Sequence, residues 1–78
     1  MTGTHYGMII GGGNAFINGV HSKCLCVRLN DFRMVRLFIP ATNYVFRVND
    51  VVSWNDTEVY WHPSPETCIK FEILGAAA

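Results

Sequence analysis

Five cysteine and histidine side chains are the residues of this chain best suited to holding a metal ion. Thiolate and imidazole are the preferred ligands of zinc, and a structural zinc site needs four of them. Cys24 and Cys26 would share one face of a strand, whereas structural sites use ligand pairs two to four residues apart at a turn. We therefore expect no metal, no cofactor, and cysteines that behave as small hydrophobic side chains. The five residues are His21, Cys24, Cys26, His62 and Cys68.

A cysteine nucleophile is the second chemistry that these residues could support. A reactive thiolate needs a base that takes its proton and a third group that orients the base. Cysteine, histidine and aspartate are all present, but no nucleophile elbow accompanies them. The carboxylates of Asp56 and Glu58 lie beside an expected turn, where acidic groups are ordinarily solvated. We therefore predict that the protein is not an enzyme.

Four arginines could bind an anion or follow a phosphate backbone. The net charge is zero, but it is +4 up to Val48 and −4 from Asn49 onward. Opposite charges could meet across neighbouring strands, where each pair contributes about 0.2–1 kcal/mol. They could instead form two faces of opposite sign that steer a charged partner. The arginines are Arg28, Arg33, Arg36 and Arg47.

Single-stranded nucleic acid is one ligand that these arginines could serve. Small barrels bind it by stacking bases on exposed aromatic rings beside a basic groove, and Tyr44, Trp54 or Tyr60 could stack in this way. The isoelectric point of about 6.8 argues against this function. A nucleotide or small anion held between subunits by arginines is a further alternative.

An aromatic cluster near the C-terminal third is the candidate partner-binding surface. Tryptophan and tyrosine are frequent at interface hot spots because they combine large apolar area with a polar group. Strand alternation would place Trp61 inward, and Tyr60 and His62 outward with Glu58. The alternative is that both tryptophans form the core of a small domain. The predicted partner-binding residues are Trp54, Tyr60, Trp61, His62 and Pro63.

Four asparagine-led dipeptides divide the chain into short apolar segments and predict the elements that position these residues. They are Asn18-Gly19, Asn30-Asp31, Asn49-Asp50 and Asn55-Asp56. Asparagine, aspartate and glycine tolerate the positive φ angles of tight hairpin turns, so the pattern predicts antiparallel strands. No segment of ten residues has a helical apolar period free of breakers.

The second and third strands are expected to pair through a two-residue turn at Asn30-Asp31. That register would put Phe32 and Met34 inward and set Arg28 opposite Arg33, which is mildly unfavourable. A longer loop, or an anion between the arginines, would relieve the repulsion. The apolar residues then change face, because Met34 lies on one side of the strand and Val35 on the other. We therefore expect a β-bulge at 34–36 or a strand buried on both faces.

Other segments are expected to be loops or further strands. The triple glycine Gly11 to Gly13 could be a bulge or a close backbone approach, but a loop is favoured. Residues 44–48 are expected to form a strand with Tyr44, Phe46 and Val48 inward. Residues 62–66 should be a rigid proline loop, 68–74 a last strand, and 75–78 a frayed tail.

The segment Phe46-Arg-Val-Asn-Asp-Val-Val52 resembles the strand-turn-strand segment of SH3-like barrels, with Asn49 in place of the usual glycine. The resemblance covers seven residues and implies fold only. Together with the turns it predicts one all-β domain over residues 1–78. We expect a small antiparallel barrel or two-layer β-sandwich of about six to eight short strands.

Composition predicts a partner for this domain. Half of the 78 residues are hydrophobic and 15% are charged, which is more apolar surface than so small a domain hides alone. We expect a homo-oligomer, with a dimer favoured. The short polar N-terminus, three cysteines and interrupted apolar runs favour a cytoplasmic protein without a membrane span. The predicted function is a self-associating, non-enzymatic interaction module that modulates a larger protein, of the phage or mobile-element accessory type.

Overall fold

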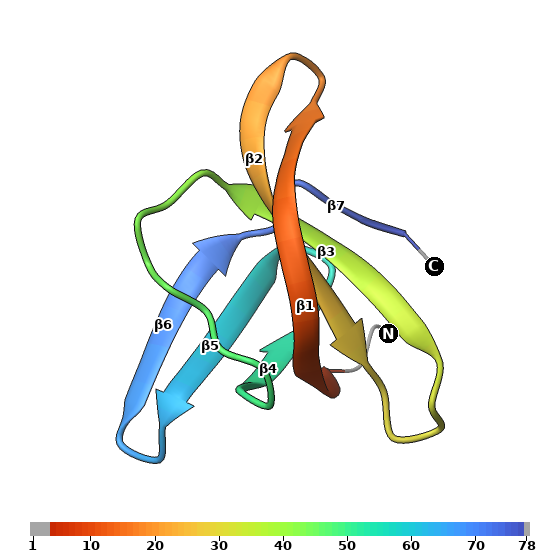
Figure 1. Ribbon diagram of the computed structural model, residues 1–78, viewed down its shortest axis with the longest axis vertical. Coiled ribbons are helices and arrows are strands. Elements are labelled where there is room, and N and C mark those ends of the chain that lie inside the picture. Colours follow the sequence, from red (N-terminus) through yellow and green to blue (C-terminus); the bar gives the residue numbers. More distant parts are fainter. Residues whose placement is uncertain (1–3, 78) are drawn as a thin grey trace.

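A computed structural model describes residues 4–77, which form seven strands and no helix (Figure 1). Among these residues there is accordingly no helix able to cross a membrane. The prediction of an all-β antiparallel fold is confirmed. The strands are β1 (His5–Ile17), β2 (Val20–Arg28), β3 (Met34–Pro40), β4 (Val51–Trp54), β5 (Glu58–Ser64), β6 (Thr67–Glu72) and β7 (Gly75–Ala77).

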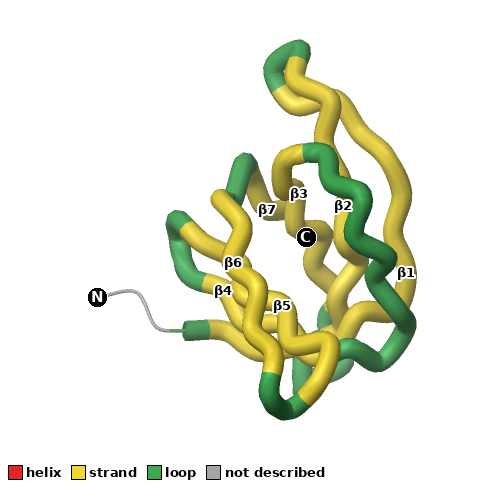
Figure 2. Tube along the Cα trace, turned by 90° about the vertical axis from the view of Figure 1, so that its left-hand side faces the viewer, coloured by secondary structure: helices red, strands yellow, loops and turns green. Residues whose placement is uncertain are grey.

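All seven strands belong to one antiparallel sheet in the order β6-β5-β4-β1-β2-β3-β7. The two outermost strands, β6 and β7, follow each other in the chain and are separated only by Ile73 and Leu74. So short a connection requires the two edges of the sheet to approach each other. The Leu74 amide donates to the Phe38 carbonyl at 2.7 Å and the Ile73 amide to that of Thr57 at 3.0 Å. The sheet is therefore curled around its inner face (Figure 2).

The core fills the inner face of this curled sheet. Alternate residues of β2 and β3 point inward, which confirms the predicted inward positions of Leu25 and Val27. Ile69, Phe71 and Ile73 pack against the core at its rim, also as predicted. Full burial of an aliphatic side chain, as at Leu25 or Val27, contributes about 1.5–3 kcal/mol. The buried apolar residues are Ile9, Leu25, Val27, Leu37, Ile39, Val52, Trp54, Val59 and Trp61.

The predicted asparagine turns are present. Asn18 and Gly19 have φ angles of 51° and 79° and join β1 to β2, with Ile17 opposite Val20. Asn49 has a φ angle of 77° before β4. The Asn55 side chain accepts bonds from the backbone amides of residues 57 and 58 and so shapes the turn between β4 and β5. The chemistry of asparagine thus fixes these turns locally.

The turn between β2 and β3 is longer than two residues. The Leu29 amide bonds the Arg33 carbonyl at 2.8 Å, and Phe32 adopts a φ angle of 66°. Three residues, 30–32, therefore form the loop, and Arg28 lies opposite Met34 rather than Arg33. The extra loop residue moves Arg33 out of register with Arg28 and so removes the like-charge pair. It also exchanges the two faces of the following strand. Val35, Leu37 and Ile39 consequently point inward without a bulge, and the prediction that Phe32 and Met34 are inward is wrong.

The triple glycine is not a loop but part of β1. An extra residue, Ile10, interrupts the pairing between Ile9 and Gly11, so a β-bulge lies just before the glycines. A Cβ atom added to Gly12 would lie 2.5 Å from the Cys24 carbonyl oxygen. The absence of a side chain at Gly12 is what lets β1 and β2 pair closely there. The prediction of a loop was wrong because the need for glycine at position 12 comes from the neighbouring strand β2, which is distant in the sequence.

Residues 41–50 form a loop rather than the expected strand. Phe46 packs on Trp61, with ring centroids 4.4 Å apart, while Tyr44 and Val48 remain exposed. Only the second half of the segment that resembles SH3-like barrels, beginning with Val51, is a strand. The chain here crosses over the inner face instead of joining the sheet.

Two segments expected to be irregular are strands. Residues 62–64 extend β5, and only Pro65 and Glu66 form the turn that follows, with Ser64 opposite Thr67. Residues 75–77, expected to be a frayed tail, form β7 and pair with β3. Ala78 lies outside the described residues.

Candidate functional site

The distal half of β1 extends beyond the strand that pairs with its proximal half. β4 pairs only with His5 to Met8, whereas β2 follows β1 to the turn at its far end. Figure 1 shows this β1–β2 hairpin projecting above the rest of the sheet. From Gly11 to Ile17, β1 is therefore a strand with one paired edge and one open edge.

The turn geometry determines which backbone groups lie on the open edge. In a two-residue hairpin the residues flanking the turn, here Ile17 and Val20, bond each other through both backbone groups. Bonding to β2 then alternates along β1, so Gly12, Asn14 and Phe16 direct their N–H and C=O groups away from β2. Within residues 4–77, no other backbone or side-chain group bonds these three residues on that side.

This edge lacks the features that usually protect exposed strands. Charged side chains, prolines and short length all discourage another chain from pairing. The outer edge of β6 has Lys70 and Glu72 beside it and a proline turn before it, and β7 has three residues. In contrast, residues 11–17 of β1 read Gly-Gly-Gly-Asn-Ala-Phe-Ile, without a charge or a proline. The open edge of β1 is therefore better able to accept a strand than the outer edges of β6 and β7.

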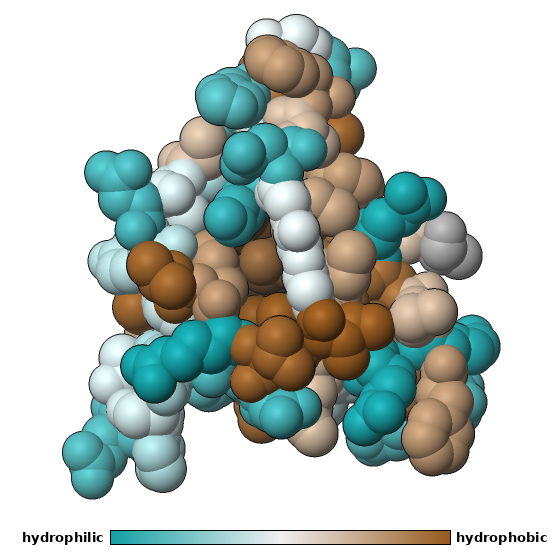
Figure 3. All heavy atoms as spheres, in the orientation of Figure 1, coloured by the Kyte–Doolittle hydropathy of each residue, from teal (hydrophilic) through white to brown (hydrophobic). Residues whose placement is uncertain are grey.

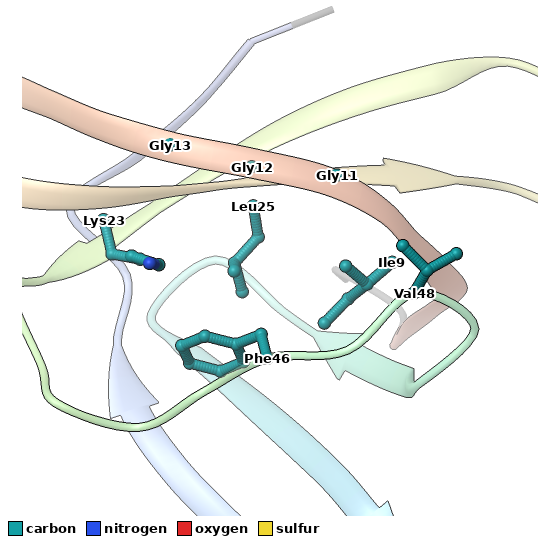
Figure 4. A pocket seen from close by; sticks show the side chains of 8 residues that line it. All are labelled: Ile9, Gly11, Gly12, Gly13, Lys23, Leu25, Phe46 and Val48. Carbon is teal, nitrogen blue, oxygen red and sulfur yellow. The ribbon is translucent and has the colours of Figure 1, made fainter.

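A cavity of about 180 Å³ adjoins the open edge on its inner side. The three glycines border it, together with apolar side chains of Ile9, Leu25, Phe46 and Val48. Lys23 is the one charged residue in its lining. In Figure 4 the side chains of Lys23, Leu25 and Ile9 point from the sheet toward the loop that carries Phe46. The cavity can accept an apolar or acidic side chain.

The far wall of the cavity is held in place by hydrogen bonds and aromatic packing. The Asp50 carboxylate accepts bonds from the Trp61 indole N–H at 2.9 Å and from the Arg47 amide at 3.1 Å. The Asn49 amide donates to the Ile9 carbonyl at 2.7 Å, which ties the end of the loop to β1. From there the loop diverges from β1 as it runs back toward β3 (Figure 1). The space beside the open edge is thus built by a fixed loop.

Exposed apolar side chains flank the open edge at both ends. Phe16, near the projecting turn, is 73% exposed and stacks on His21 with ring centroids 5.0 Å apart. Ile10, Val48 and Val51 lie near the proximal end, where Ile9 bonds the backbone of residues 49 and 50. Figure 3 shows apolar residues gathered at the lower end of β1. An added strand could cover apolar surface at either end.

The predicted aromatic residues divide between core and surface. Trp54 and Trp61 are only 5% and 4% exposed, which matches the alternative that they form the core. His62 lies on the outer face, 3.3 Å from the Ser53 hydroxyl, and Pro63 follows it in β5. Trp61 thus contributes to the candidate site indirectly, because its indole holds Asp50 and with it the cavity wall. Its buried side chain is not available at the surface.

Tyr60 belongs to a polar cluster on the outer face. Its hydroxyl donates to Glu58 at 2.7 Å, and Lys70 forms an ion pair with the same carboxylate at 3.1 Å. The Tyr60 bond and then Lys70 lower the pKa of Glu58, while the bond to Glu58 raises the pKa of Tyr60. These groups are mutually satisfied, so the cluster resembles an ordinary solvated strand face.

The four arginines do not gather into one site. Arg28 lies over the Phe32 ring at 5.4 Å, and Arg36 is its diagonal neighbour on the outer face of β2 and β3. Arg33 pairs with Asp31 at 2.6 Å, and Arg47 lies on the loop before β4. Neither ion pair in residues 4–77 joins the basic to the acidic part of the chain. The expected pairing of charges between the two parts is therefore not found there.

The thiols and imidazoles are likewise dispersed. Cys24 and Cys26 are neighbours on the outer face of β2, whereas Cys68 is exposed on β6. Burial and the neighbouring Cys26 raise the pKa of the Cys24 thiol. No three potential metal ligands among the histidine, cysteine and acidic residues come together in the described part of the chain.

Asn14 and Phe16 of the open edge, and Lys23 of the adjoining cavity, were not identified from the sequence. The uncharged run at residues 11–17 was the available signal, but a triple glycine is more typical of a loop. Comparison with models of protein families, with curated proteins and with solved structures finds no match to this chain.

Proposed function

We propose that the protein is a non-enzymatic interaction module that binds an extended segment of a partner protein as an extra strand on the open edge of β1. The observation that carries this proposal is the conjunction of unbonded backbone groups on Gly12, Asn14 and Phe16 with a side-chain cavity next to them. In strand addition, main-chain bonds supply affinity and pockets for alternate side chains supply selectivity. This edge offers both.

The backbone bonds and the apolar ends contribute to the same interaction. Each new main-chain hydrogen bond contributes about 0.5–1.5 kcal/mol net. Alternate side chains of the added strand would point to the inner face, toward the cavity and the exposed ring of Phe16. The binding surface proposed here therefore differs from the aromatic surface expected from the sequence.

Self-association is a second proposal for the same edge, with a dimer favoured. Two copies could pair their β1 strands antiparallel about a twofold axis, because such an interface is self-complementary. The hydrophobic composition and the exposed Ile10, Val48 and Val51 support it. Size-exclusion chromatography with light scattering tests it: a monomer at tens of micromolar contradicts the dimer.

Anion binding is the alternative function, and it rests on a hollow at the other end of the molecule. The hollow is about 420 Å³ and is lined by His5, Arg33 and Trp54, among others. Its support is weaker because Arg33 already pairs with Asp31. A thermal-shift screen with nucleotides tests it: stabilisation that is lost in Arg33→Met supports the site.

We propose a cytoplasmic location, which is supported by the three free cysteines. Small size and an open strand edge favour an accessory role of the phage or mobile-element type. Identification of one stoichiometric partner, lost when the β1 edge is blocked, tests this role.

Selection of short random peptides by display on the wild-type protein tests strand addition directly. Selected peptides are then titrated against Asn14→Pro, which removes an N–H group that points away from β2 and therefore leaves the β1–β2 bonds in place. We expect at least about tenfold weaker binding, since proline removes a donor and blocks the edge.

Two variants complete the comparison. Asn14→Ala measures the contribution of the amide side chain alone, and Ala41→Pro introduces a proline at an exposed loop position away from the edge. Circular dichroism confirms folding, and Asn14→Lys provides a second blocking variant with an unchanged backbone. Equal affinity of Asn14→Pro and Asn14→Ala would contradict strand addition at β1.

A further inference from the structure

We infer that the segment bound at the β1 edge carries an acidic side chain that enters the cavity and pairs with Lys23. This inference rests on the proposed strand addition and names the chemistry of the partner. Lys23 is the only charged group in the cavity lining, and within residues 4–77 no carboxylate forms an ion pair with it. The cavity thus offers a positive charge to whatever enters it.

The position of Lys23 in the sheet favours a ligand over an internal partner. It lies on the inner face of β2, opposite Asn14 of β1 and Ile39 of β3. The carboxylate of Asp50, at the end of the loop that faces β1, is engaged by the Trp61 indole and the Arg47 amide. Lys23 is therefore a charged group that lacks an ion-pair partner among residues 4–77 and lies on a largely apolar face.

The distance from Lys23 to an added strand suits a lysine–carboxylate pair. The added strand would lie two strand spacings from β2, which is about 10 Å. β1 lies between them, and its Asn14 is directly opposite Lys23, but the next inner-face position of β1 is Gly12, which has no side chain and leaves a diagonal path toward the open edge. A glutamate or aspartate on the inward side of the added strand can meet the ammonium group there.

A second copy of this chain is a poorer occupant of the β1 edge because its added strand would offer Lys23 no acidic partner. The strand it would add has the sequence of residues 11–17, which contains no acidic residue. Two copies paired through β1 would leave both Lys23 ammonium groups without a carboxylate partner. Charge complementarity therefore favours a different protein with an acidic, extended segment.

The test uses the peptides selected by display, with each alternate position substituted in turn by Glu, Gln or Lys. Dissociation constants are measured with wild-type protein, Lys23→Met and Lys23→Glu. At one inward position we expect Glu to bind about three- to fivefold more tightly than Gln. The preference should be lost in Lys23→Met, should turn toward Lys in Lys23→Glu, and should weaken as salt is raised.

The control is Lys70→Met, which removes a lysine from the outer face while leaving the cavity unchanged. It should retain the preference for Glu. Equal binding of Glu, Gln and Lys peptides at every position, with binding still blocked by Asn14→Pro, would overturn the acidic partner but keep strand addition. Binding that is insensitive to Asn14→Pro would instead overturn strand addition itself.

Discussion

Gly12 provides a sharp test of how β1 is built, because its neighbour Gly13 serves as a matched control. In Gly12→Ala the new methyl group would lie 2.5 Å from the Cys24 carbonyl oxygen, and 3.6 Å from the carbonyl carbon. Ordinary contact begins near 3.4 Å, so the two strands must separate by several tenths of an ångström. In Gly13→Ala the methyl group meets nothing within 4 Å.

The clash is the main difference between the two variants. Both replace a glycine with the same residue and so reduce the freedom of the unfolded chain equally, which stabilises by about 0.4–1 kcal/mol. Overpacking at Gly12 should cost about 1–3 kcal/mol. We therefore expect Gly13→Ala to be as stable as wild type or more stable, and Gly12→Ala to be about 1–3 kcal/mol less stable than Gly13→Ala.

Urea denaturation followed by tryptophan fluorescence measures this difference. A domain of this size has an m-value of about 1 kcal/mol per molar urea, so the two midpoints should differ by about 1–3 M. Equal midpoints would show that β1 and β2 do not approach closely at Gly12. The pairing register, and with it the assignment of the open edge, would then be wrong.

Three further predictions concern the cavity wall, the outer face and the thiols. Trp61→Phe keeps a ring in the core but loses the indole bond to the Asp50 carboxylate, so urea denaturation should show a loss of about 2 kcal/mol; a loss below about 0.5 kcal/mol contradicts that anchor. The pKa of Glu58 is lowered in the folded state by its tyrosine and lysine partners, so its stabilisation is present above the ordinary value of 4.5 and is lost as pH falls through the folded pKa. Wild type should therefore exceed Glu58→Gln in urea midpoint at pH 7 but not at pH 3, and an unchanged difference would contradict this. At pH 8, iodoacetamide should modify exposed Cys68 before Cys24, whose pKa is raised by burial; mass spectrometry showing equal rates would contradict it.

Turns and strand faces could be predicted from the sequence because their causes are local. Asn18 and Gly19 adopt positive φ angles that their side chains permit, and the alternation around Leu25 follows from the strand period. The loop at 30–32 was underestimated because Phe32 adopts a positive φ angle that aromatic residues rarely take. Nothing in its residue type signals that conformation.

The candidate site could not be predicted because it depends on where paired strands stop. The open edge exists because β4 ends its pairing at Met8 while β1 continues to Ile17, which no short segment of sequence reveals. The tryptophans illustrate the opposite problem. Residue type suits Trp61 equally to an interface and to a core, and only the packing against Phe46 and the bond to Asp50 distinguish them.

Amide hydrogen exchange along β1, followed by NMR with and without a selected peptide, tests strand addition most directly. In the free protein the amides of Gly13 and Ala15 should exchange slowly because they bond β2, whereas those of Gly12, Asn14 and Phe16 should exchange rapidly. Peptide binding should then protect those three amides selectively. Uniform protection along β1 before binding, or no gain in protection at Gly12, Asn14 and Phe16 on binding, would contradict a partner strand at this edge.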